Sequence, residues 1–204
     1  MKTLFIESKA KNIKTSLSKK DINKLPKKLL LLYSLQYKEL AESIKKQLIA
    51  SKIRIERFQQ VLGCTTLYNN QLPILLIGTG KFHAINLYLQ APIIYRLENN
   101  KITKVSSSEI KEIEVHKKSA LIKFLSADNI GILVSTKPGQ EHLNQAIILK
   151  EKLNKKGKQA FIFISNEINT SQFENFNINS WVNTACSGLS FDDSRIININ
   201  EISN

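Results

Sequence analysis

KLLLLYS, at residues 28–34, lies in the most apolar stretch of the chain. A continuous apolar run of this length is typical of a strand that is buried on both faces of a sheet. Apolar residues then recur at helical spacing from Tyr37 to Leu48, and Ile53 to Phe58 alternates with charged residues. The order strand, helix, strand predicts a mostly parallel sheet with helices on its faces.

The same order continues to the end of the chain. The further elements that we expect are strands at Thr3–Ile6, Pro73–Ile77, Pro92–Tyr95, Ile102–Val105, Ile130–Val134, Ala160–Ile164, Trp181–Thr184 and Ile196–Ile199, and helices at Phe82–Leu89, Ser106–Ser126, Gln140–Lys156 and Ser171–Phe176. Ser106 and Glu109 have the spacing of a capping box, and Gly157 has the position of a C-terminal helix stop. We therefore predict an α/β fold of two similar three-layer domains, related as an internal repeat, at residues 1–105 and 106–204.

The charge of the chain is large and unevenly distributed. The net charge is +13 over 204 residues, and residues 1–60 alone carry 15 Lys and Arg against 5 Asp and Glu. Such a segment can attract nucleic acid or an acidic partner. However, few aromatic residues alternate with the lysines and no RNA-binding motif is present, so a basic RNA- or ribosome-associated binding module is the weaker alternative.

Nothing in the sequence predicts export or a membrane span. No apolar run approaches the roughly 20 residues that a span requires, and the N-terminus lacks the pattern of a secretory signal. We expect a cytoplasmic protein with reduced thiols.

Two cysteines, Cys64 and Cys186, each follow a predicted strand. Loops at the carboxyl ends of parallel strands line the ligand crevice of such folds, so both thiols are candidates for a site. The two are far apart in sequence and form no C-x-x-C pair, which makes the metal signal weak, and free cysteine often just packs in a core.

Three further loops are candidates for ligand binding. Gly78 and Gly80 flank Thr79 after a strand, in a turn that matches neither a P-loop nor a dinucleotide fingerprint. Its N–H groups can still receive an anion, or the turn can simply join strand to helix. His83 can contact ligand or cap that helix. Gly139 and Gln140 end another loop at a strand end, and no residue can be assigned a catalytic role.

Five blocks of sequence together resemble one family. They are QVLGCT at 60–65, GTGKFH at 78–83, LVSTKPGQ at 133–140, SNEI at 165–168 and WVNTACSGLSFDD at 181–193. In this order, over nearly the whole chain, they resemble the diphthamide synthesis family, 2-(3-amino-3-carboxypropyl)histidine synthase.

This resemblance implies a specific chemistry. Family enzymes have three similar α/β domains, each of which gives one cysteine to a 4Fe–4S cluster. The cluster binds S-adenosylmethionine and releases a 3-amino-3-carboxypropyl radical, which adds to a histidine of translation elongation factor 2. By resemblance, Cys64 and Cys186 are cluster ligands. Gly78, Gly80, His83, Gly139 and Gln140 are then candidates for lining the cosubstrate pocket.

The sequence departs from the family pattern in two places. The first domain and its cysteine are missing, and Ser187-Gly188 follows Cys186 where the family usually has Pro-Arg. We therefore expect the remaining ligand to come from a separate first-domain protein or another synthase subunit, with a homodimer as a further possibility. The alternative is a non-catalytic accessory paralogue of the synthase.

Overall fold

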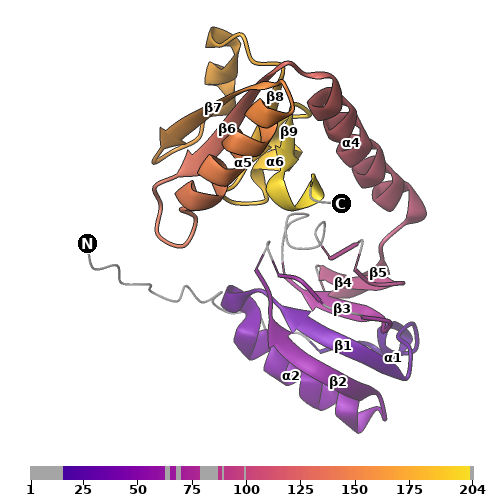
Figure 1. Cartoon of the computed structure of the whole chain (residues 1–204). Coiled ribbons are helices and arrows are strands. Elements are labelled where there is room, and N and C mark those ends of the chain that lie inside the picture. Colours follow the sequence, from indigo (N-terminus) through magenta and orange to yellow (C-terminus); the bar gives the residue numbers. More distant parts are fainter. Residues whose placement is uncertain are drawn as a thin grey trace. The chain divides into compact units, whose positions relative to one another are not determined.

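A computed structural model describes residues 16–62, 65–67, 70–78, 87–88, 90–98 and 100–202. Its contacts divide the chain into two compact units, Met1–Ile110 and Lys111–Asn204, each built on one sheet (Figure 1). The strand predicted at Thr3–Ile6 and most of the helix predicted at Phe82–Leu89 lie outside the described residues.

The first unit contains a five-stranded sheet in the order β2-β1-β3-β4-β5. Strands β1 to β4 are parallel, and β5 pairs antiparallel with β4. Its described elements are α1 (Lys19–Ile22), β1 (Lys28–Tyr33), η1 (Leu35–Tyr37), α2 (Lys38–Ala50), β2 (Arg54–Gln60), β3 (Ile74–Ile77), β4 (Ile94–Glu98) and β5 (Lys101–Lys104).

Strand β1 lies inside this sheet with both of its faces covered. Leu29 and Leu31 pack with Ile44 and Leu48 of α2. Leu29, Leu30, Leu31 and Leu32 are all at most 4% exposed. The apolar run therefore does what its length and composition predict for a strand between two covered faces.

The second unit contains a four-stranded parallel sheet in the order β7-β6-β8-β9. Its elements are α4 (Ser107–Ser126), which begins in the first unit, β6 (Asn129–Ser135), α5 (Leu143–Lys155), β7 (Gln159–Ser165), η2 (Thr170–Asn175), β8 (Ser180–Asn183), α6 (Leu189–Asp192), β9 (Ile196–Asn198) and η3 (Ile199–Glu201). Helices α4 and α5 share a core with one face of the sheet, and η2 and α6 share a core with the other. The predicted α/β class with mostly parallel sheets is confirmed.

The second face of this sheet is organised around Trp181. Gly131 on β6 is the register partner of Trp181 on β8, and a Cβ atom at Gly131 would lie 2.2 Å from ring atom Cε3. The indole is 1% exposed and stacks on Phe173 of η2 at 4.0 Å between ring centroids. Glycine is thus required at residue 131 because the ring occupies the place of a side chain.

Both predicted helix-end signals are present. Glu109 N–H donates to Ser106 Oγ at 3.2 Å, and Ser106 N–H donates to Glu109 Oε2 at 3.0 Å, which is a reciprocal capping box. Gly157 has φ +82°, and Lys158 N–H donates to the Leu153 carbonyl, as in a Schellman motif. Within the described part of the chain, no helix combines the length and apolar character that crossing a membrane requires.

Candidate functional site

Cys186 lies in a turn at the carboxyl end of β8. Its thiol is free and partly exposed. The turn follows β8 directly. Thr184 Oγ1 donates a hydrogen bond to the Leu133 carbonyl at 2.7 Å, which connects this end of β8 to β6. The position of the thiol is therefore set by the centre of the sheet.

A buried polar network fixes the backbone around this thiol. The Asn183 amide donates to the Cys186 carbonyl at 2.8 Å and accepts from Ala185 N–H at 2.9 Å. Its second N–H donates to Asn198 Oδ1 at 2.8 Å. Asn198 in turn donates to Ser190 Oγ at 2.8 Å. Buried amides hold a single geometry when all their partners are satisfied, so this network presents Cys186 in one conformation.

Sequence reasoning missed Asn183, Asn198 and Ser190. Asn183 and Asn198 are the last residues of the neighbouring strands β8 and β9 and are register partners. They are 2% and 6% exposed. Asparagine is depleted in strands, so an Asn that ends each of two apolar runs is the signal that could have found them.

The loop after β6 leaves the same edge of the sheet as the Cys186 turn, because β6 and β8 are parallel neighbours. Lys137 N–H donates to Ser135 Oγ at 3.1 Å, and Gln140 N–H donates to the Lys137 carbonyl at 3.0 Å. Gly139 has φ +78°, which favours glycine there. The candidate residues Gly139 and Gln140 thus belong to an ordered turn at the switch point between β6 and β8, where α/β sheets bind ligands.

The first unit has an equivalent switch point between β1 and β3. Ser34 N–H donates to the Ile77 carbonyl at 3.0 Å, which brings Ser34 beside Gly78. A Cβ atom at Gly78 would lie 2.8 Å from Ser34 Oγ, so this close approach favours glycine. The Ser34 hydroxyl is buried and has no hydrogen-bond partner among the described residues, which leaves a polar atom without a described partner beside the candidate residue Gly78.

Cys64, Gly80 and His83 lie outside the described residues. The residues that flank Cys64 are described and form reciprocal hydrogen bonds. Thr65 N–H donates to the Leu62 carbonyl at 3.0 Å, and Leu62 N–H donates to Thr65 Oγ1 at 2.8 Å. Within the described ranges, no group of three or more His, Cys, Asp or Glu side chains is placed to hold a metal ion.

The second unit offers no uncommitted arginine to an anionic ligand. Its single arginine by sequence is Arg195. The Arg195 guanidinium pairs with Asp193, with Nη2 at 2.6 Å from Oδ2. Burial alone would raise the pKa of Asp193, but the hydrogen bonds from Arg195 outweigh it and hold this pKa below its ordinary value. Asp193 is thus committed to Arg195.

Taken together, these features define a two-unit α/β chain that presents a supported thiol at the carboxyl edge of a parallel sheet. Comparison with known proteins gives the family. Residues 1–198 match the family described as "Putative diphthamide synthesis protein", and the chain belongs to this family.

Two curated relatives are similar to this chain. One is subunit 1 of 2-(3-amino-3-carboxypropyl)histidine synthase from Yarrowia lipolytica (strain CLIB 122 / E 150), 30% identical over 141 residues, which are 65% of this chain and 32% of the relative. The other is 2-(3-amino-3-carboxypropyl)histidine synthase from Pyrococcus horikoshii (strain ATCC 700860 / DSM 12428 / JCM 9974 / NBRC 100139 / OT-3). It is 33% identical over 137 residues, which are 66% of this chain and 40% of the relative. The matched region is thus well under half of each relative.

Two solved structures share the fold. They are crystal structures of Dph2 from Pyrococcus horikoshii, one of them with a 4Fe-4S cluster. Each has a TM-score of 0.77 and 21% sequence identity, and the match covers 90% of this chain and 58% of the other. At this identity the likeness shows the fold.

Proposed function

We propose that this chain is a component of a 4Fe–4S, S-adenosylmethionine-dependent transferase. The transferase would place a 3-amino-3-carboxypropyl group on a histidine of translation elongation factor 2, the first step of diphthamide synthesis. The observation that carries the proposal is Cys186, a free thiol in a turn that the buried Asn183 network fixes. The protein would act in the cytoplasm.

The described residues fit a contribution of one thiolate ligand. Iron–sulfur clusters are held by cysteine thiolates, and Cys186 is partly exposed at a strand end. Cys64, which stands between Leu62 and Thr65 in the sequence, would supply a second. The rest of the ligand set would come from a separate first-domain protein, another synthase subunit or a second copy of this chain. When bound, such a cluster supplies the electron that cleaves the cosubstrate.

The chain's own residues would position the reactants. Asn183 would hold the Cys186 backbone in place through its bond to the Cys186 carbonyl. Gly78 in the first unit, and Gly139 and Gln140 in the second, are proposed cosubstrate-binding residues, since loops at the switch points of parallel sheets bind ligands. Gly80 and His83 would join Gly78.

A second candidate function is a non-catalytic accessory subunit of the same synthase. The observation that favours it is that the two residues directly after the thiol are uncharged. Ser187 and Gly188 follow the thiol, and Arg195 is paired with Asp193. A carboxylate-bearing cosubstrate is commonly bound by arginine, so this chain would depend on a partner for that contact.

Anaerobic reconstitution with iron and sulfide tests both candidates. We would measure bound iron and the cluster absorption for the wild type, Cys64→Ala and Cys186→Ala, each with and without a first-domain protein. A cluster that requires both cysteines, with transfer to elongation factor 2 once the partner is present, supports the enzyme component. Such a cluster without transfer supports the accessory subunit. No cluster in either condition refutes the cofactor proposal.

A further inference from the structure

A groove in the second unit, lined by residues other than the candidate site residues, has features of a binding surface. It has a volume of about 470 Å³ and runs along α5. Residues that line it along α5 and at its C-cap extend from Gln145 to Lys156, which corresponds to about 16 Å at 1.5 Å per residue. The groove is therefore long, with the length of a short helix.

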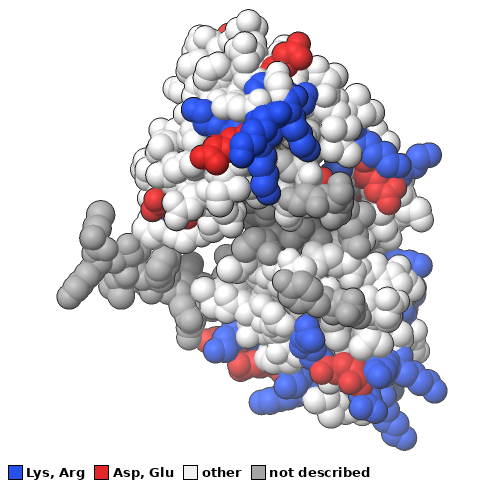
Figure 2. All heavy atoms as spheres, in the orientation of Figure 1, with Lys and Arg blue, Asp and Glu red and all other residues white. Residues whose placement is uncertain are grey.

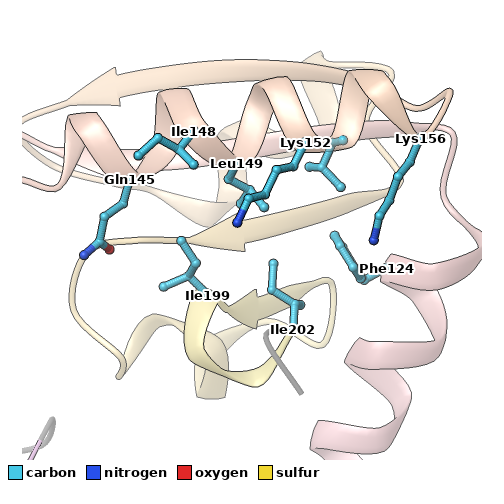
Figure 3. A pocket seen from close by; sticks show the side chains of 9 residues that line it. Phe124, Gln145, Ile148, Leu149, Lys152, Lys156, Ile199 and Ile202 are labelled. Atoms are coloured by element: carbon cyan, nitrogen blue, oxygen red, sulfur yellow. The ribbon is translucent and has the colours of Figure 1, made fainter.

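The floor and far wall of the groove are apolar. Phe124 of α4 and Ile199 and Ile202 at the end of the chain face Ile148 and Leu149 of α5 across it (Figure 3). Ile148 is 54% exposed, so apolar area there is open to solvent. An open apolar groove beside a helix is the surface into which a second amphipathic helix binds.

Two lysines give this groove its charge. Lys152 of α5 and Lys156, which caps this helix, extend toward the opposite wall (Figure 3). Within the described part of the chain, neither ammonium has an ion pair with a carboxylate. Lys and Arg side chains gather over α5 on this face of the unit (Figure 2). Lysines near a helix C-terminus also stabilise its dipole, but that role does not require their side chains to reach across a groove.

We propose that this groove binds a short amphipathic helix of a partner protein, with an apolar stripe flanked by acidic residues. The apolar stripe would lie on Phe124, Ile148, Ile199 and Ile202. Carboxylates on one edge of the stripe would pair with Lys152 and Lys156. Charge complementarity favours an acidic partner, and the length of the groove favours a helix of about three turns. This proposal does not rest on the proposed transferase function.

Synthetic peptides of about 12 residues test it. One has leucines at i, i+3 and i+7 flanked by glutamates, and its partner has the glutamates replaced by lysines. Binding to the full chain is measured by fluorescence anisotropy at low salt, and the contacted residues by amide chemical shifts. The acidic peptide is expected to bind, with shifts along α5 and η3, and the basic peptide at least tenfold more weakly.

The variant K152E/K156E should lower the affinity for the acidic peptide about tenfold or more and should allow the basic peptide to bind. The variant K111E/K118E makes the same charge change at exposed positions outside the groove and should leave both affinities unchanged. Ile202→Ala should lower the affinity for the acidic peptide, while the chain should still bind the acidic peptide more tightly than the basic one.

Several results overturn the proposal. These are equal binding of the two peptides, binding that K111E/K118E weakens as much as K152E/K156E does, and chemical-shift changes that leave out α5, Phe124 and residues 199–202. If lauric acid binds in the groove and the acidic peptide does not, the groove is a lipid-binding site instead. Self-association in sedimentation velocity that K152E/K156E abolishes, without peptide binding, would make it an interface between copies.

Discussion

Gly131→Ala is the substitution whose effect the structure defines most sharply. The new methyl group would lie 2.2 Å from Cε3 and 2.4 Å from Cζ3 of the Trp181 ring. Carbon atoms in contact are ordinarily about 3.5–4.0 Å apart, so the ring edge or strand β6 must move by roughly 1 Å or more. The ring has little freedom to move, because it is 1% exposed and stacked on Phe173.

Overpacking a well-packed core costs about 1–3 kcal/mol, and we expect the upper end of this range because the clash is with a rigid ring. In a unit of this size each kcal/mol lowers the melting temperature by about 4–8 °C. Chemical and thermal unfolding of Gly131→Ala, followed by tryptophan fluorescence and circular dichroism, should therefore show a loss of about 10 °C or more.

Two comparisons separate the clash from other effects of losing a glycine. A Cβ atom at Gly157 would have no neighbour within 4 Å, although its φ is +82°, so Gly157→Ala measures backbone strain without a clash. Trp181→Leu removes the ring, and its combination with Gly131→Ala should be less destabilising than the sum of the two by about 1 kcal/mol or more. A Gly131→Ala loss below about 1 kcal/mol, or an additive double mutant, would refute this account.

Three further substitutions test the polar contacts. Asn183→Ala should lower the free energy of unfolding in urea by about 2–4 kcal/mol, since it leaves several buried groups without partners. It should also speed thiol labelling of Cys186, and an unchanged labelling rate contradicts the role of Asn183 in positioning Cys186. Glu109→Gln should cost about 1 kcal/mol at neutral pH, since it removes the charge that faces Arg96 at 3.0 Å. Hydrogen bonds from the Ser106 backbone and from Arg96 lower the pKa of Glu109 from 4.5. The difference in unfolding free energy between Glu109→Gln and the wild type should therefore shrink as the pH falls below 4.5. A difference that does not change with pH contradicts this role of the Glu109 charge. Hydrogen bonds from Lys24 and Ser18 lower the pKa of Asp21 from 3.8 to about 2. The ionised Asp21 carboxylate therefore stabilises the fold fully above pH 3.8, and this stabilisation is lost as the pH falls toward 2. Asp21→Asn should make the free energy of unfolding less dependent on pH over this window, and an unchanged pH dependence there refutes the role given to Asp21.

Patterns local in sequence predicted most of the described strands and the long helices α2, α4 and α5, but not the short helix α6, and the helix expected at 171–176 is the 3-10 helix η2. The apolar run at residues 28–34 marks β1 because burial on both faces leaves no polar position. The pair Ser106 and Glu109 marks the start of α4 because both caps lie within one turn. These signals need no knowledge of the tertiary structure, and the blocks of family sequence added the expected loops.

Contacts between distant residues were not predictable in the same way. Gly131 and Trp181 meet only because β6 and β8 are neighbours in a particular register. The Asn183 and Asn198 side chains pair across 15 residues for the same reason. Strand order and register arise from the packing of whole layers, and a single sequence contains no local signal for them. The assignment of residues 1–105 and 106–204 to two family domains stays a prediction, as does the role of Cys64.

The support of the thiol and the recognition of an anionic cosubstrate are separable in this chain. Cys186 depends on Asn183 and, through it, on the core of the second unit, so its position does not require an arginine in the following turn. Gly188 has φ −65° and ψ −27°, a conformation open to any residue, so the backbone itself does not demand glycine there. The second unit therefore presents the Cys186 thiol in an ordered turn, while its one arginine, Arg195, is paired with Asp193. Under the proposed function, Cys186 would contribute a cluster ligand, and a partner would supply the cation that binds the cosubstrate.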